Sequence, residues 1–537
     1  MKLNLRKTIG SIFCFCALLT FTIDAQEYSH YENGQFAPFN RHIYKPGSGF
    51  HTSLQQYSLT EINEIINSDS VLYDGLRIPK GKLNFWKRIF HDDLLKWEDE
   101  KIKIVINPLF NFEGGYESVD GQKTIVNSRG LFVKGNIGNH FSFYTDFIES
   151  QATFPNYLDQ FARETNYVPG QGQRKNFGSN GHDYAQATGY ISFNAAKYFN
   201  FQLGNGKNFI GDGYRSLLLS DAAFSYPYLK FTTTFWNVKY MIMWNKMLQY
   251  DEEKDNTDYR YPAKYGVFHY LDWNIGKRLS VGLFESVVWA AEDTTGHRGF
   301  DAHYLNPIIF FRPVEYTQGS PDNVTMGLNM KYIAAKWATL YGQFVLGEFK
   351  FDEVFSGEKW WANKQGFQVG VKTFDLFGVK NLDVQAEYNQ VRPYTYSHYT
   401  TIYAYGHLNQ PLAHPFGANF REGLGILNYK NRRWLFRGEL MLTKYGEDTN
   451  DDVSWGKDVF KPNVDRPYDY GHTIGQGVST TVYNADVNLS YLINPRNMFN
   501  IVAGVRLRQL TTDQCTQETQ FVYFGIRTSL KNLYYDF

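Results

Sequence analysis

From about residue 101 onward, apolar and polar side chains alternate along the sequence with a period of two. In the segment 382–390, leucine, valine, alanine and tyrosine alternate with aspartate, glutamine, glutamate and asparagine. The segment 499–508 repeats the pattern, and its polar side ends in Arg506 and Arg508. A period of two indicates a β-strand whose faces meet different surroundings. Charged side chains are costly against lipid but not in a wet lumen, so we predict membrane-spanning strands with lumen-facing arginines.

The connections between these strands alternate between short and long. The short ones fall near 137–139, 195–198, 236–238, 274–278, 334–336, 375–380, 430–433 and 493–496. The longer, polar ones fall near 114–124, 151–187, 205–225, 249–263, 291–322, 348–363, 392–419, 445–476 and 510–517. This alternation is typical of an outer-membrane barrel with tight periplasmic turns and larger extracellular loops. We therefore predict an all-β transmembrane barrel of about 18 antiparallel strands over residues 101–537.

The composition agrees with a barrel. Aromatic residues make up 18% of the chain, yet the mean hydropathy is −0.44. Both values fit strands that are apolar toward lipid and polar toward the lumen, with aromatic girdles at the membrane interfaces. A soluble β-sandwich or propeller is the alternative, and it explains neither the loop alternation nor the N-terminus.

The N-terminus predicts export. A basic start and an uncharged apolar run over 9–23 predict a signal peptide over residues 1–25, cleaved after Ala25. Ile23, the third residue before the cleavage point, is larger than the residue preferred there. The alternative is an uncleaved anchor. The mature chain keeps only Cys515, which excludes an intramolecular disulfide and a zinc–cysteine cluster. Together with the strands, this predicts the outer membrane of a Gram-negative cell.

Residues 26–100 follow another pattern. The segments Ser58–Asp69 and Asn84–Glu100 place apolar residues at helical spacing, and the first begins with a Ser-x-x-Glu sequence that can cap a helix. We predict a short N-terminal helical region on the periplasmic side or in the mouth of the barrel.

Charge and motifs exclude several functions. Lys plus Arg and Asp plus Glu both number 54, which argues against a broad nucleic-acid-binding surface. The sequence has neither a Gly-x-Ser-x-Gly elbow nor a His-Glu-x-x-His helix. Acids such as Asp383 and Glu387 lie at lumen-facing positions, where no enzyme is needed to explain them. We predict a non-enzymatic protein without a cofactor, although a barrel hydrolase built from facing strands leaves no linear motif.

The run Gly204–Phe231 contains four glycines before an apolar triplet and several aromatic residues. It lacks the Lys-Ser/Thr of a phosphate loop and the third glycine of a dinucleotide fingerprint. We predict the third extracellular loop followed by the sixth strand, with Gly211 and Gly213 turning the loop inward. Asp212 and Arg215 are then predicted to be partners inside the lumen rather than ligands to a nucleotide.

The segment 391–421 combines histidine, arginine, asparagine and tyrosine. One hypothesis is a carbohydrate-contacting loop, because tyrosine rings stack on sugars while polar groups bind hydroxyls. The alternative is a loop folded into the lumen whose polar groups satisfy one another. A metal site on its three histidines lacks a ligand signature. The candidate ligand-binding residues are Arg392, Tyr394, Tyr396, His398, His407, Asn409, Gln410, His414 and Arg421, together with Asp212, Arg215 and Arg312.

Two sequence elements resemble known families. The run Gly204–Phe231, with its SLLLSD core, and the segment His303–Tyr316 resemble elements of the Wzi-type capsule assembly barrels. Most of residues 26–537, including Val391–Phe420 and Arg527–Phe537, resembles the RemB-type proteins linked to gliding motility. The resemblance implies an 18-stranded outer-membrane barrel at the cell surface that handles surface polysaccharide.

These observations predict a non-enzymatic role in binding or assembling surface polysaccharide, or in gliding motility and adhesion. The expected partners are outer-membrane lipid, surface polysaccharide and other cell-surface or secretion-complex proteins, with no nucleic acid. A porin or specific solute channel is the first alternative, and an outer-membrane hydrolase is the second.

Overall fold

The computed structural model describes residues 28, 33–77, 83–138, 140–196, 198–251, 260–293, 296–307, 321–348, 350–528 and 531–537. The predicted signal peptide and the candidate residue Arg312 lie outside these ranges. Within them, no helix combines the length and the apolar content needed to cross a bilayer.

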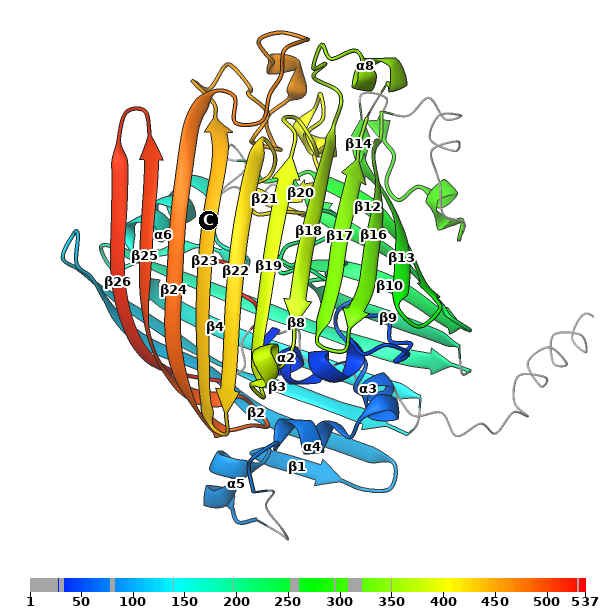
Figure 1. The fold of residues 1–537 in the computed structure, drawn as a ribbon, viewed down its shortest axis with the longest axis vertical. Helices are drawn as coiled ribbons and strands as arrows, with labels where there is room; N and C mark the ends of the chain where they lie inside the picture. The colour runs from blue at the N-terminus through cyan, green and yellow to red at the C-terminus, as the bar shows by residue number, and fades with distance from the viewer. Residues whose placement is uncertain are drawn as a thin grey trace, which may run out of the picture.

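The chain folds into a closed barrel of 18 antiparallel strands, as predicted (Figure 1). The barrel strands are β2 (Ile102–Glu117), β3 (Gln122–Ile137), β4 (Phe141–Thr153), β8 (Gly181–Ala195), β9 (Phe199–Gly206), β10 (Tyr226–Phe235), β11 (Val238–Leu248), β12 (Ala263–Ile275), β13 (Leu279–Ala290), β16 (Asn323–Ala335), β17 (Ala338–Leu346), β18 (Gln365–Thr373), β19 (Leu382–Val391), β22 (Phe420–Asn431), β23 (Trp434–Glu447), β24 (Val478–Asn494), β25 (Phe499–Thr512) and β26 (Thr516–Arg527). Each pairs with the next, and β2 pairs with β26, which closes the barrel.

Shorter elements lie in the connections. They are α6 (Asn156–Thr165), β5 (Tyr167–Val168), β6 (Gly172–Gln173), β7 (Lys175–Phe177), β14 (Glu292–Asp293), β15 (Gly296–His297), η2 (Ala302–Leu305), α8 (Phe351–Phe355), η3 (Leu376–Gly378), η4 (Thr401–Tyr403), β20 (Gly406–His407), β21 (Gln410–Pro411) and η5 (Asn463–Asp465).

The two ends of the barrel differ in their connections. At the short-turn end, β10 and β11 are joined by residues 236–237 alone, whereas at the long-loop end residues 207–225 join β9 to β10. The run Gly204–Phe231 is thus a long loop followed by the sixth barrel strand, as predicted, with Pro227 at the second residue of that strand. Proline near a strand start removes no essential ladder hydrogen bond.

Side chains alternate across the wall as the sequence indicates. On β23, Leu440 is 64% exposed on the outer face, whereas its neighbour Glu439 is buried inside. On β25, Leu507 faces outward and Arg508 is buried in the lumen. The apolar face therefore meets lipid, and the polar face meets the contents of the lumen.

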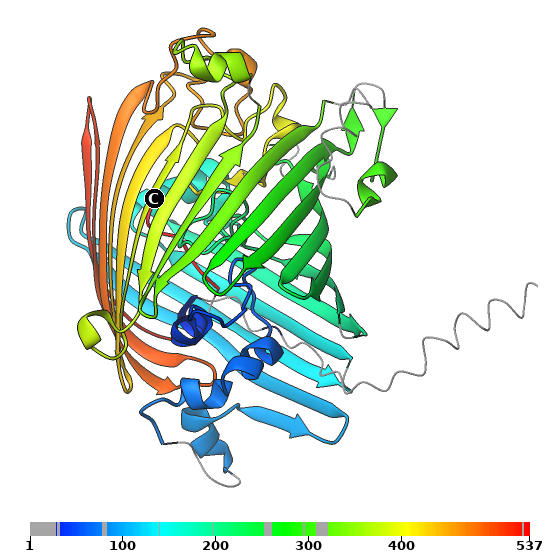
Figure 2. The ribbon, with the colours of Figure 1, turned by 45° about the vertical axis from the view of Figure 1, so that its right-hand side comes forward.

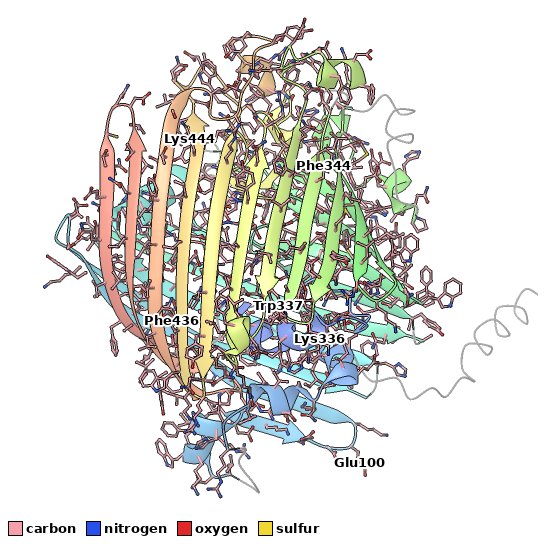
Figure 3. The ribbon with its side chains drawn as sticks, in the orientation of Figure 1. Glu100, Lys336, Trp337, Phe344, Phe436 and Lys444 are labelled. Carbon is pink, nitrogen blue, oxygen red and sulfur yellow. The ribbon has the colours of Figure 1, made fainter. Side chains whose placement is uncertain are left out.

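Exposed aromatic residues surround the short-turn end. Trp337 lies there next to Lys336, and Phe436 lies at the same end on β23 (Figure 3). Others at this end are Phe141, Tyr198, Phe199, Phe235, Trp236, Trp273, Tyr332, Phe377, Trp434 and Tyr491. Such a band is typical of the aromatic girdle that barrels place at the membrane interface.

The N-terminal region is helical and lies at the short-turn end (Figure 2). Its helices are α2 (Asn33–Ile43), α3 (Leu59–Ile65), α4 (Ser68–Leu72) and α5 (Phe85–His91). The Ser58 side chain caps α3 by accepting a hydrogen bond from the Glu61 amide, as the sequence indicated. Arg41 on α2 pairs with Asp375 and Asp383 of the wall, which anchors the helix at the mouth.

The predicted helical pattern of Asn84–Glu100 is wrong beyond His91. The chain becomes extended at Asp92, and β1 (Leu95–Glu98) pairs with residues 103–106 of β2. The reason is the register of the closing strands, because β26 pairs with β2 only from Asn111 onward. This leaves the first residues of β2 with an unpaired edge, which β1 covers.

An arginine placed on the lipid-facing wall tests the assignment of the faces. We expect Leu440→Arg to lose about 2–4 kcal/mol of folding free energy, because a charge near the middle of a strand would face hydrocarbon. Urea unfolding in lipid vesicles, followed by tryptophan fluorescence, measures the loss. The control is Val464→Arg, since Val464 is 58% exposed but lies in the loop 448–477. Equal losses in the two variants would contradict the assignment.

Candidate functional site

Three segments fill the lumen, and we call them the plug: residues 207–225, 392–419 and 531–537. Arg215 lies at their centre and is 2% exposed. Its Nη2 is 3.2 Å from Glu422 Oε1 on β22 and 2.9 Å from Asp536 Oδ2. One guanidinium therefore joins the first plug segment, the wall and the last plug segment.

The backbone of the first plug segment is held against the wall beside Arg215. The amides of Tyr214 and Arg215 donate to the Glu387 carboxylate at 2.8 and 3.1 Å. The inward turn depends on glycine, because Gly211 has a φ of 149° and a Cβ at Gly213 would lie 2.5 Å from the Arg215 carbonyl oxygen. The predicted role of these glycines is confirmed.

Asp212 is also buried in the lumen, but its partners differ from those of Arg215. Its carboxylate accepts hydrogen bonds from Tyr44 at 2.9 Å, from Thr52, and from Asn329 on β16 at 3.2 Å. Asp212 therefore ties the N-terminal region to the plug. Both residues are buried in the lumen, but the prediction that they are partners is wrong, because Arg215 reaches Glu422 and Asp536 instead.

The last plug segment runs back from β26 into the lumen. Tyr534 donates to Asp221 at 2.7 Å, and Lys531 pairs with Asp146 on β4 at 2.9 Å. Arg508 of β25 donates to the Phe537 carbonyl oxygen at 2.9 Å. These residues were not identified from the sequence, because nothing in the local pattern shows that the segment folds back.

The segment 392–419 packs on the first plug segment. The hydroxyls of Tyr396 and Tyr405 donate to the carbonyl oxygens of Leu217 and Leu218, each at 2.6 Å. The two tyrosine rings stack with their centroids 5.6 Å apart. Tyr396 therefore stabilises the packing of one loop on another.

The histidines of this segment are buried and lie in different surroundings. His407 accepts a hydrogen bond from the Leu248 amide, while His398 packs against Tyr399 and Tyr403. Burial lowers the pKa of His407 to about 3 and that of His398 to about 4. Both are therefore neutral at physiological pH, and the three histidines do not converge on one point.

His414 belongs to the Arg215 cluster. Its Nδ1 accepts from the Phe416 amide, so its Nε2 carries the proton and donates to Glu422 at 2.8 Å. Burial lowers the pKa of His414, although Glu422 opposes this shift. Burial also disfavours the charge on Arg215, but Asp536 and Glu422 outweigh it and raise the pKa of Arg215.

The other candidate residues lie apart. Tyr394 is buried and donates to the Ser454 carbonyl oxygen, and Gln410 accepts from the Gly170 amide. Asn409 donates to the Thr165 carbonyl oxygen at 3.4 Å. Arg392 holds the carbonyl oxygens of Asn363 and Trp360. Arg421 is exposed on the outer side of β22. Apart from Arg421, these residues thus contact the chain itself, as in the second of the two hypotheses.

A second surface lies at the long-loop end, and we call it the loop-end patch: Trp360, Trp361, Arg466, Tyr468 and Tyr470. Tyr468 and Tyr470 are exposed, and the Arg466 guanidinium lies 4.1 Å from the Trp361 ring centroid. The Trp361 amide donates to the Asp469 carbonyl oxygen, which joins the loops 347–364 and 448–477. Sequence reasoning missed this patch, although the adjacent tryptophans and the Tyr-x-Tyr run were a visible signal.

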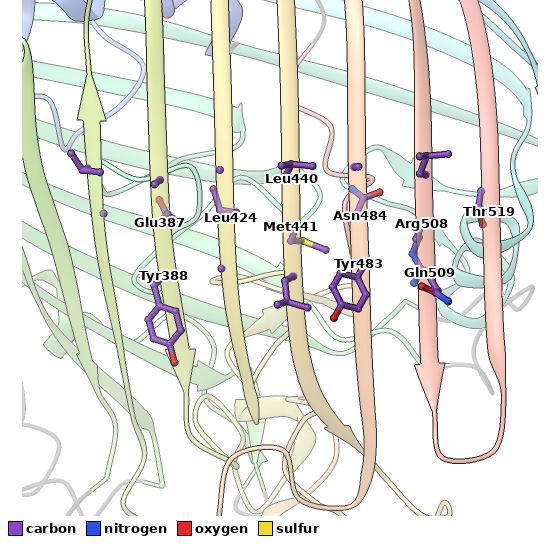
Figure 4. A pocket seen from close by; sticks show the side chains of 18 of the residues that line it. Glu387, Tyr388, Leu424, Leu440, Met441, Tyr483, Asn484, Arg508, Gln509 and Thr519 are labelled. Carbon is purple, nitrogen blue, oxygen red and sulfur yellow. The ribbon is translucent and has the colours of Figure 1, made fainter. Parts of the chain in front are cut away.

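The structure contains cavities of different character. A chamber of about 610 Å³ lies at the short-turn end, between the N-terminal helices and the wall. A smaller cavity of about 320 Å³ separates the last plug segment from β2–β4 and β25–β26. A hollow of about 1100 Å³ lies on the wall over β18–β26, where Gly423 and Gly425 leave room beside Tyr388, Leu440 and Tyr483 (Figure 4). Its exposed apolar side chains make it part of the lipid-facing surface.

Neither a metal cluster nor a disulfide occurs among the described residues. They contain no group of three His, Cys, Asp or Glu side chains arranged to hold a metal ion. Cys515 is a free, exposed thiol in the connection between β25 and β26.

The fold is similar to solved outer-membrane barrels. Wzi of Escherichia coli, an outer-membrane protein involved in group 1 capsule assembly and a carbohydrate-binding β-barrel, is 13% identical, with a TM-score of 0.55 over 95% of this chain and 100% of Wzi. OprD of Pseudomonas aeruginosa is 10% identical, with a TM-score of 0.43 over 80% of this chain and 94% of OprD. No protein-family model matches the sequence, and no curated protein matches it significantly. At these identities the likeness shows the fold alone.

Removing Arg215 tests whether the plug is locked to the wall. We expect Arg215→Met to destabilise the protein by about 3–5 kcal/mol, because Glu422 and Asp536 lose their buried counter-ion. Adding Glu422→Gln should recover part of the loss. The control is Arg163→Met, whose exposed pair with Asp159 on α6 is worth about 0–1 kcal/mol. Chemical unfolding in detergent measures all three variants, and similar losses for Arg215→Met and Arg163→Met would contradict the lock.

Proposed function

We propose that this protein is a non-enzymatic outer-membrane barrel that binds or assembles polysaccharide at the cell surface, with its long loops outside. The observation that carries the proposal is the plug. It fills the lumen with loops bound to the wall through buried ion pairs such as Arg215 with Glu422. A barrel filled in this way offers its loop surface, rather than a pore, for function.

The likeness to Wzi supports this proposal. That protein shares the barrel over its whole length and is a carbohydrate-binding protein involved in capsule assembly. The sequence resemblance to the RemB-type proteins supports a role in gliding or adhesion by the same surface. Both roles need a barrel that displays a binding surface, and a gene deletion scored for capsule, attachment and spreading distinguishes them.

The loop-end patch has the chemistry of a carbohydrate contact. Its aromatic rings offer apolar faces to sugar rings, and Arg466 offers donors to hydroxyl or carboxylate groups. Arg392, one of the residues predicted from the sequence, supports the patch from below by holding the Trp360 carbonyl oxygen at 3.2 Å. In this proposal Arg392 positions the patch, while Trp361 and Tyr470 touch the ligand.

Substitutions in the patch test the binding surface. We expect Trp361→Ala and Tyr470→Ala each to weaken retention of purified surface polysaccharide about tenfold, because a lost ring contact of about 1.4 kcal/mol corresponds to that factor. Arg392→Ala should weaken it less. The control is Tyr116→Ala, an exposed tyrosine at the long-loop end of β2. Retention equal to wild type by Trp361→Ala and Tyr470→Ala would eliminate the patch as the site.

Conductance in planar bilayers distinguishes the proposal from a porin or specific channel. We expect little steady conductance from the wild-type barrel, and more from a variant lacking residues 531–537, because that segment anchors Arg215 and Asp221. Large steady conductance in the wild type would favour the channel. Lipase or glycosidase activity in the purified barrel would overturn the non-enzymatic role.

A further inference from the structure

The chamber at the short-turn end is built from distant parts of the chain. Its floor comes from α2 and α4, and its walls from β18, β19, β22–β26 and the turn between β16 and β17. Gly213 and Tyr214 of the plug line its inner end. Its volume of about 610 Å³ lies within the range of about 300–1,000 Å³ that small-molecule sites occupy.

The lining of the chamber is strongly basic. Eight cationic side chains face three carboxylates, an excess of five positive charges. The cations are Arg41, Lys45, Lys336, Lys372, Lys380, Lys430, Arg437 and Arg527, and the carboxylates are Asp74, Asp375 and Asp383. Because the chain as a whole has no net charge, this excess is a local property of the chamber. Low-dielectric walls concentrate such a field and attract anions.

All three carboxylates are already paired. Asp375 and Asp383 bind Arg41, and Asp74 binds Lys380 at 3.0 Å. Arg437 pairs with Glu439, which lies outside the lining. Across the described part of the chain, five lining cations have no ion pair: Lys45, Lys336, Lys372, Lys430 and Arg527. The chamber therefore holds five cations without a direct ion pair.

Lys372 is the most unusual of the five. It is 8% exposed, and its Nζ lies 3.5 Å from the Tyr44 hydroxyl and 5.1 Å from the Tyr44 ring centroid. Burying an ammonium group is costly, and no carboxylate forms an ion pair with Lys372, although Asp212 and Glu387 attract it from farther away. These attractions and the cation–π contact offset only part of the cost. An anion in the chamber would supply the missing counter-charge.

His42 reports the same positive field. Burial lowers the pKa of the His42 imidazole, and the neighbouring Lys45 and Arg41 lower it further, while Asp375 and Asp74 oppose them more weakly. The positive field therefore extends to the mouth of the chamber, where α2 lies beside the wall.

The chamber also has groups that recognise a hydroxylated ring. Tyr57 and Tyr214 contribute aromatic side chains, and Asn428 and Gln385 contribute amides that both donate and accept hydrogen bonds. A small inorganic anion needs neither feature, since two or three cations suffice to hold it. The combination of spaced cations, amides and rings suits a longer ligand.

We propose that this chamber binds an acidic oligosaccharide, a short chain of sugars carrying several carboxylate, sulfate or phosphate groups. The unpaired cations bind its acidic groups, the amides bind its hydroxyls, and the aromatic side chains pack on its rings. This site lies at the opposite end of the barrel from the loop-end patch. It does not depend on ligand binding by the patch.

Calorimetry on the full-length protein in detergent tests the proposal, with tetragalacturonate as the acidic probe and maltotetraose as the neutral probe of equal length. We expect tetragalacturonate to bind and maltotetraose not to bind. Each lysine that loses its charge-assisted hydrogen bond should weaken binding about tenfold or more, so Lys336→Gln and Lys430→Gln together should nearly abolish it. Binding should also weaken as salt concentration rises.

Three controls keep the outcome interpretable. Lys359→Gln removes an exposed lysine at the long-loop end and should bind like wild type, while Lys430→Arg should keep most of the affinity. Trp361→Ala removes the loop-end patch and should leave binding in the chamber unchanged. Folding of each variant is checked by circular dichroism. Equal binding of both tetrasaccharides, binding of pyrophosphate as tight as that of tetragalacturonate, or full binding by the double lysine variant would overturn the proposal.

Discussion

A peptide group in hydrocarbon finds no hydrogen-bond partner in its solvent, and this constraint governs the architecture of the chain. The first and last barrel strands meet along Asn111–Glu117 and Phe521–Arg527, so the wall closes on itself. Before Asn111 the edge of β2 is not paired with β26, and β1 pairs there with residues 103–106. The same requirement therefore closes the barrel and draws the N-terminal region onto the sheet.

A closed wall with alternating faces turns a row of polar side chains inward from every strand, and these also need partners. Glu387 and Glu422 point into the lumen, where the plug supplies the Tyr214 and Arg215 amides and the Arg215 guanidinium. Asp536, in the last plug segment, also pairs with Arg215 and completes the cluster. Wall and plug thus satisfy one another, because neither the carboxylates nor the guanidinium would be stable alone at that depth.

The strands, the loop alternation and the inward turn of Gly204–Phe231 could be predicted because each leaves a local pattern in the sequence. The contact of Arg215 with Glu422 could not, since any lumen-facing carboxylate fits the pattern equally well. The strand at Leu95–Glu98 was missed because its pairing depends on where β26 ends. The loop-end patch was missed because Trp361 and Asp469 meet only through the fold. Local periodicity specifies elements, whereas partners depend on register and loop closure.

Two adjacent residues of the plug have different surroundings: one lies inside the plug, and the other lines the basic chamber. Arg215 is fixed by two carboxylates, and Tyr214, the next residue, lines the inner end of the basic chamber. Because the Glu387 carboxylate holds both backbone amides, this inner end is ordered before any ligand arrives. A ligand entering a preformed site loses less affinity to the ordering of loops. The ion pairs inside the lumen therefore also preorganise the inner end of the chamber, and the segment 207–225 links the chamber to the rest of the plug.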